Sequence, residues 1–426
     1  MNDEQSPDLT KKRDPEDYYK LSRSQLFNHF DTENKKSKPD HKIMDFITKR
    51  LWSWLYYYLR SRFLPNHAYP AYVSPDTGVY TLEKNGGPEV DYISIAIVAD
   101  WATDTNESIQ IAQKMDDHHP DYTIHMGDTY YVGAPHEIEN NFIKPGSPWV
   151  RGNTGSFGLL GNHEMYAQGI AFFDNLLPTL GIKNKGTGIY EGQKTGFFCL
   201  ENDHWRILGL DTGYHSIGKI PVVELIFPPD CHFDPILMQW LEDTVHLNDP
   251  ADKKGILIIT HHQYITAFKT ETEYMKPAAQ LAQLIGKDRP VVWLWGHEHK
   301  FSTFEKAQVG DGITAYGRCI GHGGMPVELN SKSFQINENT KGASKLVMVD
   351  TRPKPGTEKY PLGYNGYAII KIQGSALSIE YYDTRNLLLT ERWTVDLNGV
   401  ITGTAFPDPD FKVTTKDNKP WSRMVG

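Results

Sequence analysis

The stretch Tyr122-Thr-Ile-His-Met-Gly-Asp128-Thr-Tyr-Tyr131-Val-Gly133 organises the rest of the chain. Its first residues form a short apolar run that predicts a buried strand, and Gly127 allows the backbone to turn sharply at the end of that strand. Asp128 follows the turn, where the sheets of α/β proteins commonly carry their chemistry. A carboxylate, followed three residues later by the phenol of Tyr131, could bind a hard metal ion. A Gly-Asp turn is also common without a metal, so this stretch alone leaves both interpretations open.

The composition is that of a globular protein. The 426 residues are 39% hydrophobic and 23% charged, and the 10 Trp and 23 Tyr favour a packed body over disorder. This length accommodates one large domain with additions, or two domains. The net charge of −9 argues against a general electrostatic attraction to nucleic acid or to anionic membranes. A site for phosphate would therefore need local positive charge, for which bound metal ions are the simplest source.

The three cysteines, Cys199, Cys231 and Cys319, are far apart and odd in number. They form neither a disulfide framework nor a C-x-x-C zinc site, so histidine, aspartate, asparagine and tyrosine would have to hold a metal. The polar N-terminus has no apolar core of a secretory signal, and no run of about 18 apolar residues predicts a membrane-spanning helix. A cytoplasmic location is the expectation.

Residues 1–90 are expected to be an N-terminal extension. Within it, residues 43–64 carry apolar residues at helical spacing together with four lysines and arginines, which predicts an amphipathic helix. A basic, aromatic helix of this kind could lie on a membrane surface. Apolar residues run nearly all the way round it, however, which favours packing against the main domain. A hairpin is expected next, with residues 78–82 as its first strand and residues 84–88 as its turn.

Residues 91–395 are expected to form the main domain, and residues 396–426 a C-terminal tail. The first part alternates apolar runs with helical stretches, and the part after Gly296 carries short runs rich in β-forming residues. This predicts an α/β (α+β) fold, a two-layer β-sandwich flanked by helices. Strands are expected at 93–99, 122–126, 156–160, 197–201, 205–210, 255–260, 291–295, 313–320, 346–350, 367–372, 377–382 and 387–395, and helices at 106–115 and 236–246.

Five of the expected strands end in residues that can bind metals. Each such ending is common by itself, but five of them at strand ends are an improbable coincidence, so we expect one metal site at one edge of a sheet. The five turns are Val98-Ala-Asp100-Trp-Ala102, Gly127-Asp128-Thr-Tyr-Tyr131, Leu160-Gly-Asn162-His163-Glu164, Ile259-Thr-His261-His262-Gln-Tyr264 and Trp295-Gly-His297-Glu298-His299.

The donors suit two ions. Two ions roughly 3.5–4 Å apart need a shared anionic bridge, and the carboxylate of Asp128 is the natural candidate. Because alternate residues of an extended segment point to opposite sides, His297 and His299 could serve different ions, with Glu298 pointing away to support the loop. One ion would have Asp100, Tyr131 and His299, and the other Asn162, His261 and His297.

These five blocks resemble the calcineurin-like metallophosphoesterase superfamily, which carries D-x-[H/G], G-D-x-x, G-N-H-[D/E], a histidine after a strand, and G-H-x-H in that order. Most members have a histidine two residues after the first aspartate, where this chain has Ala102. The chain has Tyr131 instead, and this exchange resembles the small, tartrate-resistant type of purple acid phosphatase. Asp100-Trp-Ala102 is similar to the D-W-G of that group, and residues 366–372 are similar to its late G-[F/Y]-A strand.

The resemblance implies two metal ions, Fe(III) and a divalent ion that could be iron, zinc or manganese. The ferric ion would be held by Asp100, Asp128, Tyr131 and His299, and the divalent ion by Asp128, Asn162, His261 and His297. The resemblance also implies that His163 contacts the substrate phosphate and protonates the leaving oxygen, with Glu164 steadying it. His262 could bind phosphate or simply pack, and His215 is a candidate substrate contact.

The expected activity is hydrolysis of phosphomonoesters by direct attack of a metal-bound hydroxide, without a phosphoenzyme. The substrate would be a small phosphorylated molecule or a phosphoprotein, and no nucleic-acid partner is expected. A phosphodiesterase with zinc or manganese on the same scaffold remains an alternative. A second alternative is a membrane-surface or partner-binding protein with an inactive site.

Overall fold

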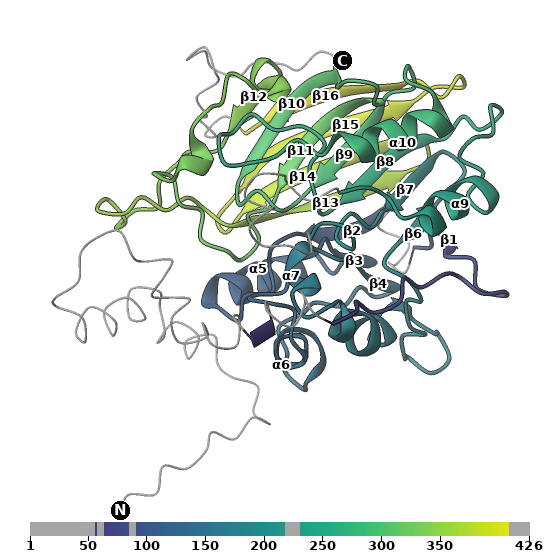
Figure 1. Cartoon of the computed structure of the whole chain (residues 1–426), viewed down its shortest axis with the longest axis horizontal. Helices are drawn as coiled ribbons and strands as arrows, with labels where there is room; N and C mark the ends of the chain where they lie inside the picture. Colours follow the sequence, from purple (N-terminus) through teal and green to yellow (C-terminus); the bar gives the residue numbers. More distant parts are fainter. Residues whose placement is uncertain (1–55, 58–63, 85–90, 218–230, 409–426) are drawn as a thin grey trace, which may run out of the picture.

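The computed structural model describes residues 56–57, 64–84, 91–217 and 231–408, and the expected amphipathic segment 43–64 lies almost entirely outside these ranges. Two eight-stranded sheets face each other and form the two layers of a sandwich (Figure 1). This confirms the expected α/β class. Within the described ranges, no helix is long and apolar enough to cross a membrane.

Sheet A has the strand order β1-β6-β7-β8-β9-β11-β10-β12. Its central strands β7, β8, β9 and β11 run parallel, so their carboxyl ends meet at one edge. The strands are β1 (Val79–Thr81), β6 (Phe198–Glu201), β7 (Trp205–Gly209), β8 (Gly255–Thr260), β9 (Val291–Trp295), β10 (Phe301–Gln308), β11 (Thr314–Ile320) and β12 (Leu346–Val349).

Sheet B has the order β16-β15-β14-β13-β2-β3-β4-β5. Strands β2, β3 and β4 are parallel, and β13 to β16 extend the sheet as an antiparallel meander. The strands are β2 (Ile93–Val98), β3 (Tyr122–His125), β4 (Gly155–Gly158), β5 (Gly181–Ile182), β13 (Gly366–Gln373), β14 (Ala376–Asp383), β15 (Leu387–Val395) and β16 (Ile401–Pro407).

Helices cover the outer faces of the two sheets. Figure 1 shows α9 (Pro235–Asp243) and α10 (Met275–Ile285) beside sheet A, whereas α5 (Asn106–Asp116), α6 (Pro135–Ile138) and α7 (Asn162–Met165) gather near β2, β3 and β4. Short π-helical and 3₁₀ turns complete the described helices at Glu139–Ile143, Phe172–Leu176, Leu177–Thr179, Lys332–Phe334 and Lys341–Ser344.

Three apolar clusters follow from this layering. The largest lies between the sheets and takes residues such as Ile97 and Leu257 from opposite layers. A second fills the space under α9 and α10, around Trp293. The third lies under α5 and α6, around Trp101. The central strands β2, β3, β8 and β9 are buried on both faces, so their sequences are nearly continuous apolar runs that the sequence reveals. Strands β14 and β15 instead alternate buried with more exposed residues.

The two expected helices are confirmed, each with a capping residue at its start. The Asp234 carboxylate accepts a hydrogen bond of 2.9 Å from the Ile236 backbone N–H, and Pro235 occupies the first helical position of α9. Thr105 caps α5 through the backbone N–H of Ser108. The structure adds α10 and β10, which the sequence analysis did not identify.

The expected hairpin at 78–88 is wrong in its pairing, and residues 85–88 of its expected turn lie outside the described residues. Strand β1 pairs in parallel with β6, with Val79 opposite Cys199, and so joins the far edge of sheet A. The Tyr72 hydroxyl donates to the Phe197 carbonyl at 2.7 Å and the Trp240 indole donates to the Thr77 carbonyl at 2.7 Å. These contacts hold the segment against sheet A, where more apolar surface is available than in an isolated hairpin.

The sheet also extends past the expected end of the domain at residue 395. Strand β16 pairs with β15 along its length, so that Thr394 lies opposite Thr402. The carboxylate of Asp396 accepts hydrogen bonds from the backbone N–H groups of Asn398 and Val400 and closes the turn between the strands. This corrects the expected C-terminal tail at residues 396–426, whose first part contains β16.

One ion pair joins the two sheets inside the core. Arg318 of β11 and Glu391 of β15 are both fully buried, with 2.7 Å between the Arg318 Nη2 and the Glu391 Oε1. The Tyr381 hydroxyl donates to the other oxygen of Glu391 at 2.9 Å, and the Arg318 Nη1 donates to the Phe304 carbonyl at 2.8 Å. Both charges therefore have several partners, as buried charges require.

We expect Glu391→Ala to lower the free energy of unfolding by roughly 3–5 kcal/mol, because the Arg318 guanidinium stays buried without its counter-charge. Urea unfolding followed by tryptophan fluorescence measures this loss. The double variant Arg318→Met/Glu391→Leu should recover most of it, since no charge is left buried. Glu83→Gln removes an exposed pair with Lys185 and should change stability by less than about 1 kcal/mol. Equal losses in Glu391→Ala and Glu83→Gln would contradict this account.

Candidate metal centre

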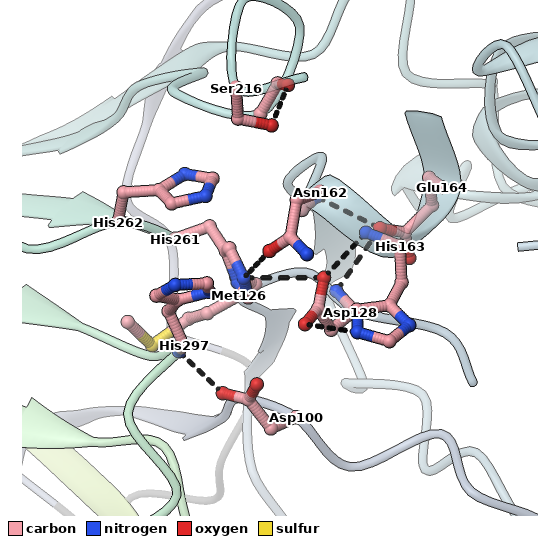
Figure 2. A network of polar contacts seen from close by, with 12 residues as sticks. Asp100, Met126, Asp128, Asn162, His163, Glu164, Ser216, His261, His262 and His297 are labelled. Carbon is pink, nitrogen blue, oxygen red and sulfur yellow. Dashed lines mark hydrogen bonds and ion pairs between the residues drawn. The ribbon is translucent and has the colours of Figure 1, made fainter. Parts of the chain in front are cut away.

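The parallel strands of both sheets bring the predicted ligands together at their carboxyl ends. Sheet B supplies Asp100 after β2, Asp128 after β3, and Asn162 at the start of α7 after β4. Sheet A supplies His261 directly after β8, and His297 and His299 after β9. Figure 2 shows Asp128 and Asn162 facing the histidines of sheet A across a small space.

Asp128 lies at the centre of this group. The Nε2 of His261 is 3.2 Å from the Asp128 Oδ1 and 3.2 Å from the Asn162 Oδ1. The backbone N–H of His163 donates to the same Asp128 oxygen at 3.0 Å. Burial by itself would raise the pKa of Asp128, but His261 and His163 outweigh it and hold the pKa well below its usual range. The carboxylate is thus ionised and placed between residues of both sheets.

The hydroxyl of Tyr130 occupies the place that the sequence analysis gave to Tyr131. It lies 2.8 Å from the Asp100 Oδ1, 3.0 Å from the Asp128 Oδ2 and 2.8 Å from the His299 Nε2. Tyr130 is buried, whereas Tyr131 is partly exposed. The structure therefore assembles Asp100, Asp128 and His299 as expected, but with Tyr130 as the phenol beside them.

Backbone contacts explain this difference. The carboxylate of Glu137 accepts hydrogen bonds from the backbone N–H groups of Tyr131, Val132 and Ala134. The backbone N–H of Tyr130 donates to the Ala102 carbonyl at 2.9 Å, in the loop of Asp100. These bonds fix which of the two adjacent phenols turns inward. No feature of the spacing distinguishes adjacent tyrosines, because the loop follows no regular periodicity.

The ligand-bearing turns contain strained backbone. Asp100, Asp128 and His297 have φ values of 54°, 69° and 64°, in the left-handed region that side-chain-bearing residues seldom adopt. Gly127, directly before Asp128, has a φ of 97°, and a Cβ atom at this position would lie 2.8 Å from the His261 Nδ1. Such strain persists only where surrounding contacts fix it, and it clusters at functional sites.

His163 and Glu164 have separate surroundings. The Nδ1 of His163 is hydrogen-bonded to the Tyr131 carbonyl at 2.6 Å, and its Nε2 lies 3.8 Å from the Asp128 Oδ2. Glu164 is buried and accepts hydrogen bonds from the backbone N–H groups of Gly161 and Asp128. Burial and the Asp128 charge raise the pKa of Glu164 to about 7. The Tyr131 carbonyl therefore orients the ring of His163, while Glu164 ties together two ligand turns.

His262 lies beside His261 and His297. It is buried, its ring centroid is 4.6 Å from that of His297, and Thr212 contacts its backbone N–H and its Nδ1. His215, three residues after Thr212, is hydrogen-bonded at 2.9 Å to Asp234 at the start of α9 and stacks on His232. The role of His215 in substrate binding stays a prediction.

The turn that carries His297 and His299 is held in place by the contacts of the residue between them, Glu298. Glu298 is buried, and its carboxylate accepts hydrogen bonds from the Thr266 hydroxyl and, at 3.3 Å, from the Trp295 indole. The fully buried Lys300 ammonium lies 3.6 Å from Glu271 and 4.2 Å from the centre of the Phe268 ring. Glu298 therefore points into the protein, as expected from the sequence, but the segment bends at His297, whose φ is 64°, and does not run extended.

The donor set fits metal ions. One donor atom each from Asp100, Asp128 and His261 lies within 4.8 Å of the others, and the same holds for His261, His262 and His297. The two carboxylates are buried and close together, an arrangement that a cation stabilises. Carboxylate, amide and imidazole donors are those that iron, zinc and manganese accept.

Comparison with known proteins agrees with this geometry. Residues 93–301 match the model of the calcineurin-like phosphoesterase family. This match covers just under half of the 426 residues and supports a metal-dependent phosphoesterase, a hydrolase. Members of the matched family generally depend on two metal ions. The closer relationship to purple acid phosphatases is not part of this finding.

Solved structures give weaker likenesses. "GAP50 the anchor in the inner membrane complex of Plasmodium" has 10% identity and a TM-score of 0.47 over 72% of this chain and 90% of that chain. The structure of PhoD has 12% identity and a TM-score of 0.44 over 76% and 73%. A predicted phosphoesterase from Streptococcus pneumoniae TIGR4 has 12% identity and a TM-score of 0.26 over 74% and 99%. No curated protein matches the sequence significantly. The family assignment rests on the family model.

The loop that carries Thr212 contains a buried acid, Asp211. Backbone N–H groups of Gly213 and Tyr214 donate to it, yet burial raises its pKa from 3.8 to about 7. In the unfolded chain the carboxyl ionises near pH 4. Between pH 4 and 7 the unfolded state therefore loses its proton more readily than the folded state, and Asp211 increasingly destabilises the fold as the pH rises.

We expect Asp211→Asn to remove this dependence. The variant should be more stable than the parent at pH 8, by on the order of 1–3 kcal/mol, and should gain nothing at pH 4. Urea unfolding at both pH values measures the difference. Asp311→Asn is a matched control, because Asp311 is exposed and paired with Lys287, which lowers its pKa. A gain at pH 8 in Asp311→Asn equal to that in Asp211→Asn would refute the burial account.

Proposed function

We propose that the enzyme hydrolyses phosphomonoesters with a ferric ion and a divalent ion, as purple acid phosphatases do. The observation that carries this proposal is the Tyr130 hydroxyl, which lies within 3.0 Å of both Asp100 and Asp128 and 2.8 Å from His299. Two carboxylates, a phenol and one imidazole form a hard, oxygen-rich donor set, which suits Fe(III) better than a softer ion. Tyr130 thus replaces Tyr131 as the proposed ferric ligand.

The second ion would be held by Asn162, His261 and His297 and shared with the first through Asp128. When bound, the two ions would supply an activated water molecule as nucleophile and positive charge for the phosphoryl oxygens. In the absence of an ion, burial and the charges of Asp100 and Asp128 raise the pKa of Tyr130 well above 10. The charge of an ion would take the place of the phenolic proton.

His163 is the proposed general acid. Because its Nδ1 is engaged by the Tyr131 carbonyl, its Nε2 is the nitrogen available toward Asp128 and the centre. A histidine in this position can protonate the leaving oxygen of the ester. Glu164 is a positioning residue, since it acts on the backbone of the turns that hold Asp128 and Asn162.

The substrate is proposed to be a small phosphorylated molecule or a phosphoprotein rather than a nucleic acid. The net charge of −9 gives no general attraction to polyanions, and the centre itself would provide the local positive charge. A phosphodiesterase with zinc or manganese is the runner-up. The phosphodiesterase would use the same donor residues. The identity of the ion in the Tyr130 site therefore distinguishes it from the ferric phosphomonoesterase.

Protein purified without added metal should contain about one iron per chain and absorb visible light, because a phenolate bound to Fe(III) gives a charge-transfer band. Tyr130→Phe should lose the band, whereas Tyr131→Phe should keep it. The measurement is a visible spectrum with elemental analysis of the three proteins, and Tyr131→Phe is the matched control because it removes the adjacent phenol. A colourless protein with two zinc or manganese ions would refute the ferric proposal and favour the phosphodiesterase. Loss of the band in Tyr131→Phe alone would restore the original assignment.

His163→Gln should reduce kcat by roughly 10²- to 10⁴-fold for a poor leaving group, because the departing oxygen must leave without a proton. The reduction should be much smaller for p-nitrophenyl phosphate, whose leaving group needs little protonation. Steady-state kinetics with phenyl phosphate and p-nitrophenyl phosphate test this. Equal reductions for both esters would argue against a general acid and for a role in binding phosphate alone.

A further inference from the structure

We propose that His262 is a further metal ligand, the third imidazole of the ion held by Asn162, His261 and His297, and that Thr212 is the residue that positions it. This inference rests on the proposed metal centre. It does not depend on whether the substrate is a monoester or a diester, nor on iron in the Tyr130 site.

The position of His262 gives it access to this ion. It follows His261 directly at the end of β8, and its ring centroid is 4.8 Å from that of His261 and 4.6 Å from that of His297. One ring nitrogen from each of the three histidines lies within 4.8 Å of the others. Figure 2 shows the three rings on the same side of Asp128 and Asn162. Three imidazoles therefore surround a single space.

Thr212 fixes the orientation of His262. Its hydroxyl oxygen accepts the backbone N–H of His262 at 2.9 Å and lies 3.2 Å from the Nδ1 of the same residue. Nδ1 is thereby engaged by Thr212, which leaves Nε2 as the nitrogen that would bind a cation. His261 is arranged in the same way, with its Nδ1 3.0 Å from the Met126 carbonyl and its Nε2 near Asp128. Metal-binding histidines typically engage the second nitrogen in this manner.

A second buried histidine, His125, provides a comparison, because it contacts the described residues around it through ring packing and not through hydrogen bonds. His125, at the end of β3, is fully buried, and neither of its ring nitrogens has a hydrogen-bond partner among the described residues. Its ring instead packs against three aromatic rings, those of Trp101, Phe142 and Trp149. His262 differs because a hydroxyl holds one nitrogen and its ring lies against two candidate ligands.

The tautomer of His262 decides between two roles. If Nδ1 carries the proton and donates it to Thr212, the lone pair of Nε2 is available to a cation. If the Thr212 hydroxyl donates to Nδ1 instead, Nε2 carries the proton and would donate to a phosphoryl oxygen. The Thr212 Oγ1 already accepts the backbone N–H of His262 and has a second lone pair that can accept the Nδ1–H of the same residue. The first arrangement, a metal ligand, is the one we propose.

The test is Co²⁺ binding to the metal-depleted full-length protein, measured by calorimetric titration and by the visible ligand-field spectrum. His262→Gln should weaken one of the two Co²⁺ ions by more than 10-fold, alter the spectrum of that ion and leave the other unchanged. Thr212→Val should weaken the same ion about 10- to 100-fold, whereas Thr212→Ser keeps the hydroxyl and should bind as the parent does. His118→Gln is the matched control, because the His118 ring is hydrogen-bonded to the Tyr367 hydroxyl and not to a proposed ligand, and it should bind both ions as the parent does.

Near-ultraviolet circular dichroism and the midpoint of urea unfolding confirm that each metal-free variant is folded. If His262→Gln is not folded, the comparison of Thr212→Val with Thr212→Ser tests the inference in its place. Unchanged Co²⁺ affinity and spectrum in His262→Gln or in Thr212→Val would overturn the inference. So would normal Co²⁺ binding together with a raised inhibition constant for inorganic phosphate, which would make His262 a phosphate contact. A parent protein that binds no Co²⁺ would refute the metal centre itself together with this inference, whereas the first two results leave the centre standing.

Discussion

The carboxylate of Asp128 is the point on which the two layers of the sandwich converge. It belongs to sheet B, but its oxygens contact the Nε2 of His261 from sheet A, the backbone N–H of His163 and the hydroxyl of Tyr130. Neither sheet alone could assemble this set, because each contributes only part of the donors. The parallel order of β2, β3 and β4 in one sheet and of β7, β8 and β9 in the other directs both sets of strand ends to the same edge. The packing of one sheet on the other is therefore what places Asp128 beside His261.

Holding acidic groups so close together has a cost that the surrounding protein must offset. Asp100 and Asp128 are both buried, and three ligand-bearing residues have left-handed backbone conformations. Hydrogen bonds from Tyr130 and from backbone N–H groups of His163 and His297 partly neutralise the two carboxylates. Cations would complete the neutralisation, so metal binding and the stability of this edge should be linked. The core between the sheets, with its buried pair of Arg318 and Glu391, supplies the rigid frame.

Much of this arrangement could be predicted from the sequence, because parallel strands buried on both faces read as short apolar runs and the metal-binding residues follow them directly. Asp100, Asp128, Asn162, His261, His297 and His299 lie together for that reason. The rest depends on contacts that no local pattern specifies. The pairing of β1 with β6 joins segments far apart in the chain, and the turn at Asp396 that leads into β16 was not recognised. The choice of Tyr130 over Tyr131 is set by Glu137 and Ala102, which fix the backbone of an irregular loop.

The pairing of Ala102 with this loop also bears on which ion the first site selects. Ala102 and Thr129 form an isolated bridge, and the backbone N–H of Tyr130 donates to the Ala102 carbonyl, so the phenol arises next to the residue where most members of the resembled superfamily carry a histidine. Compared with those members, this chain would have the Tyr130 phenol in place of a neutral imidazole, and a phenol is anionic when it binds a metal ion. Asp100 and a Tyr130 phenolate would then give the first site two negative charges of its own, whereas Asn162, His261 and His297 would give the second site none and Asp128 would be shared. Of two ions that differ in charge, electrostatics therefore favour the more highly charged one in the first site.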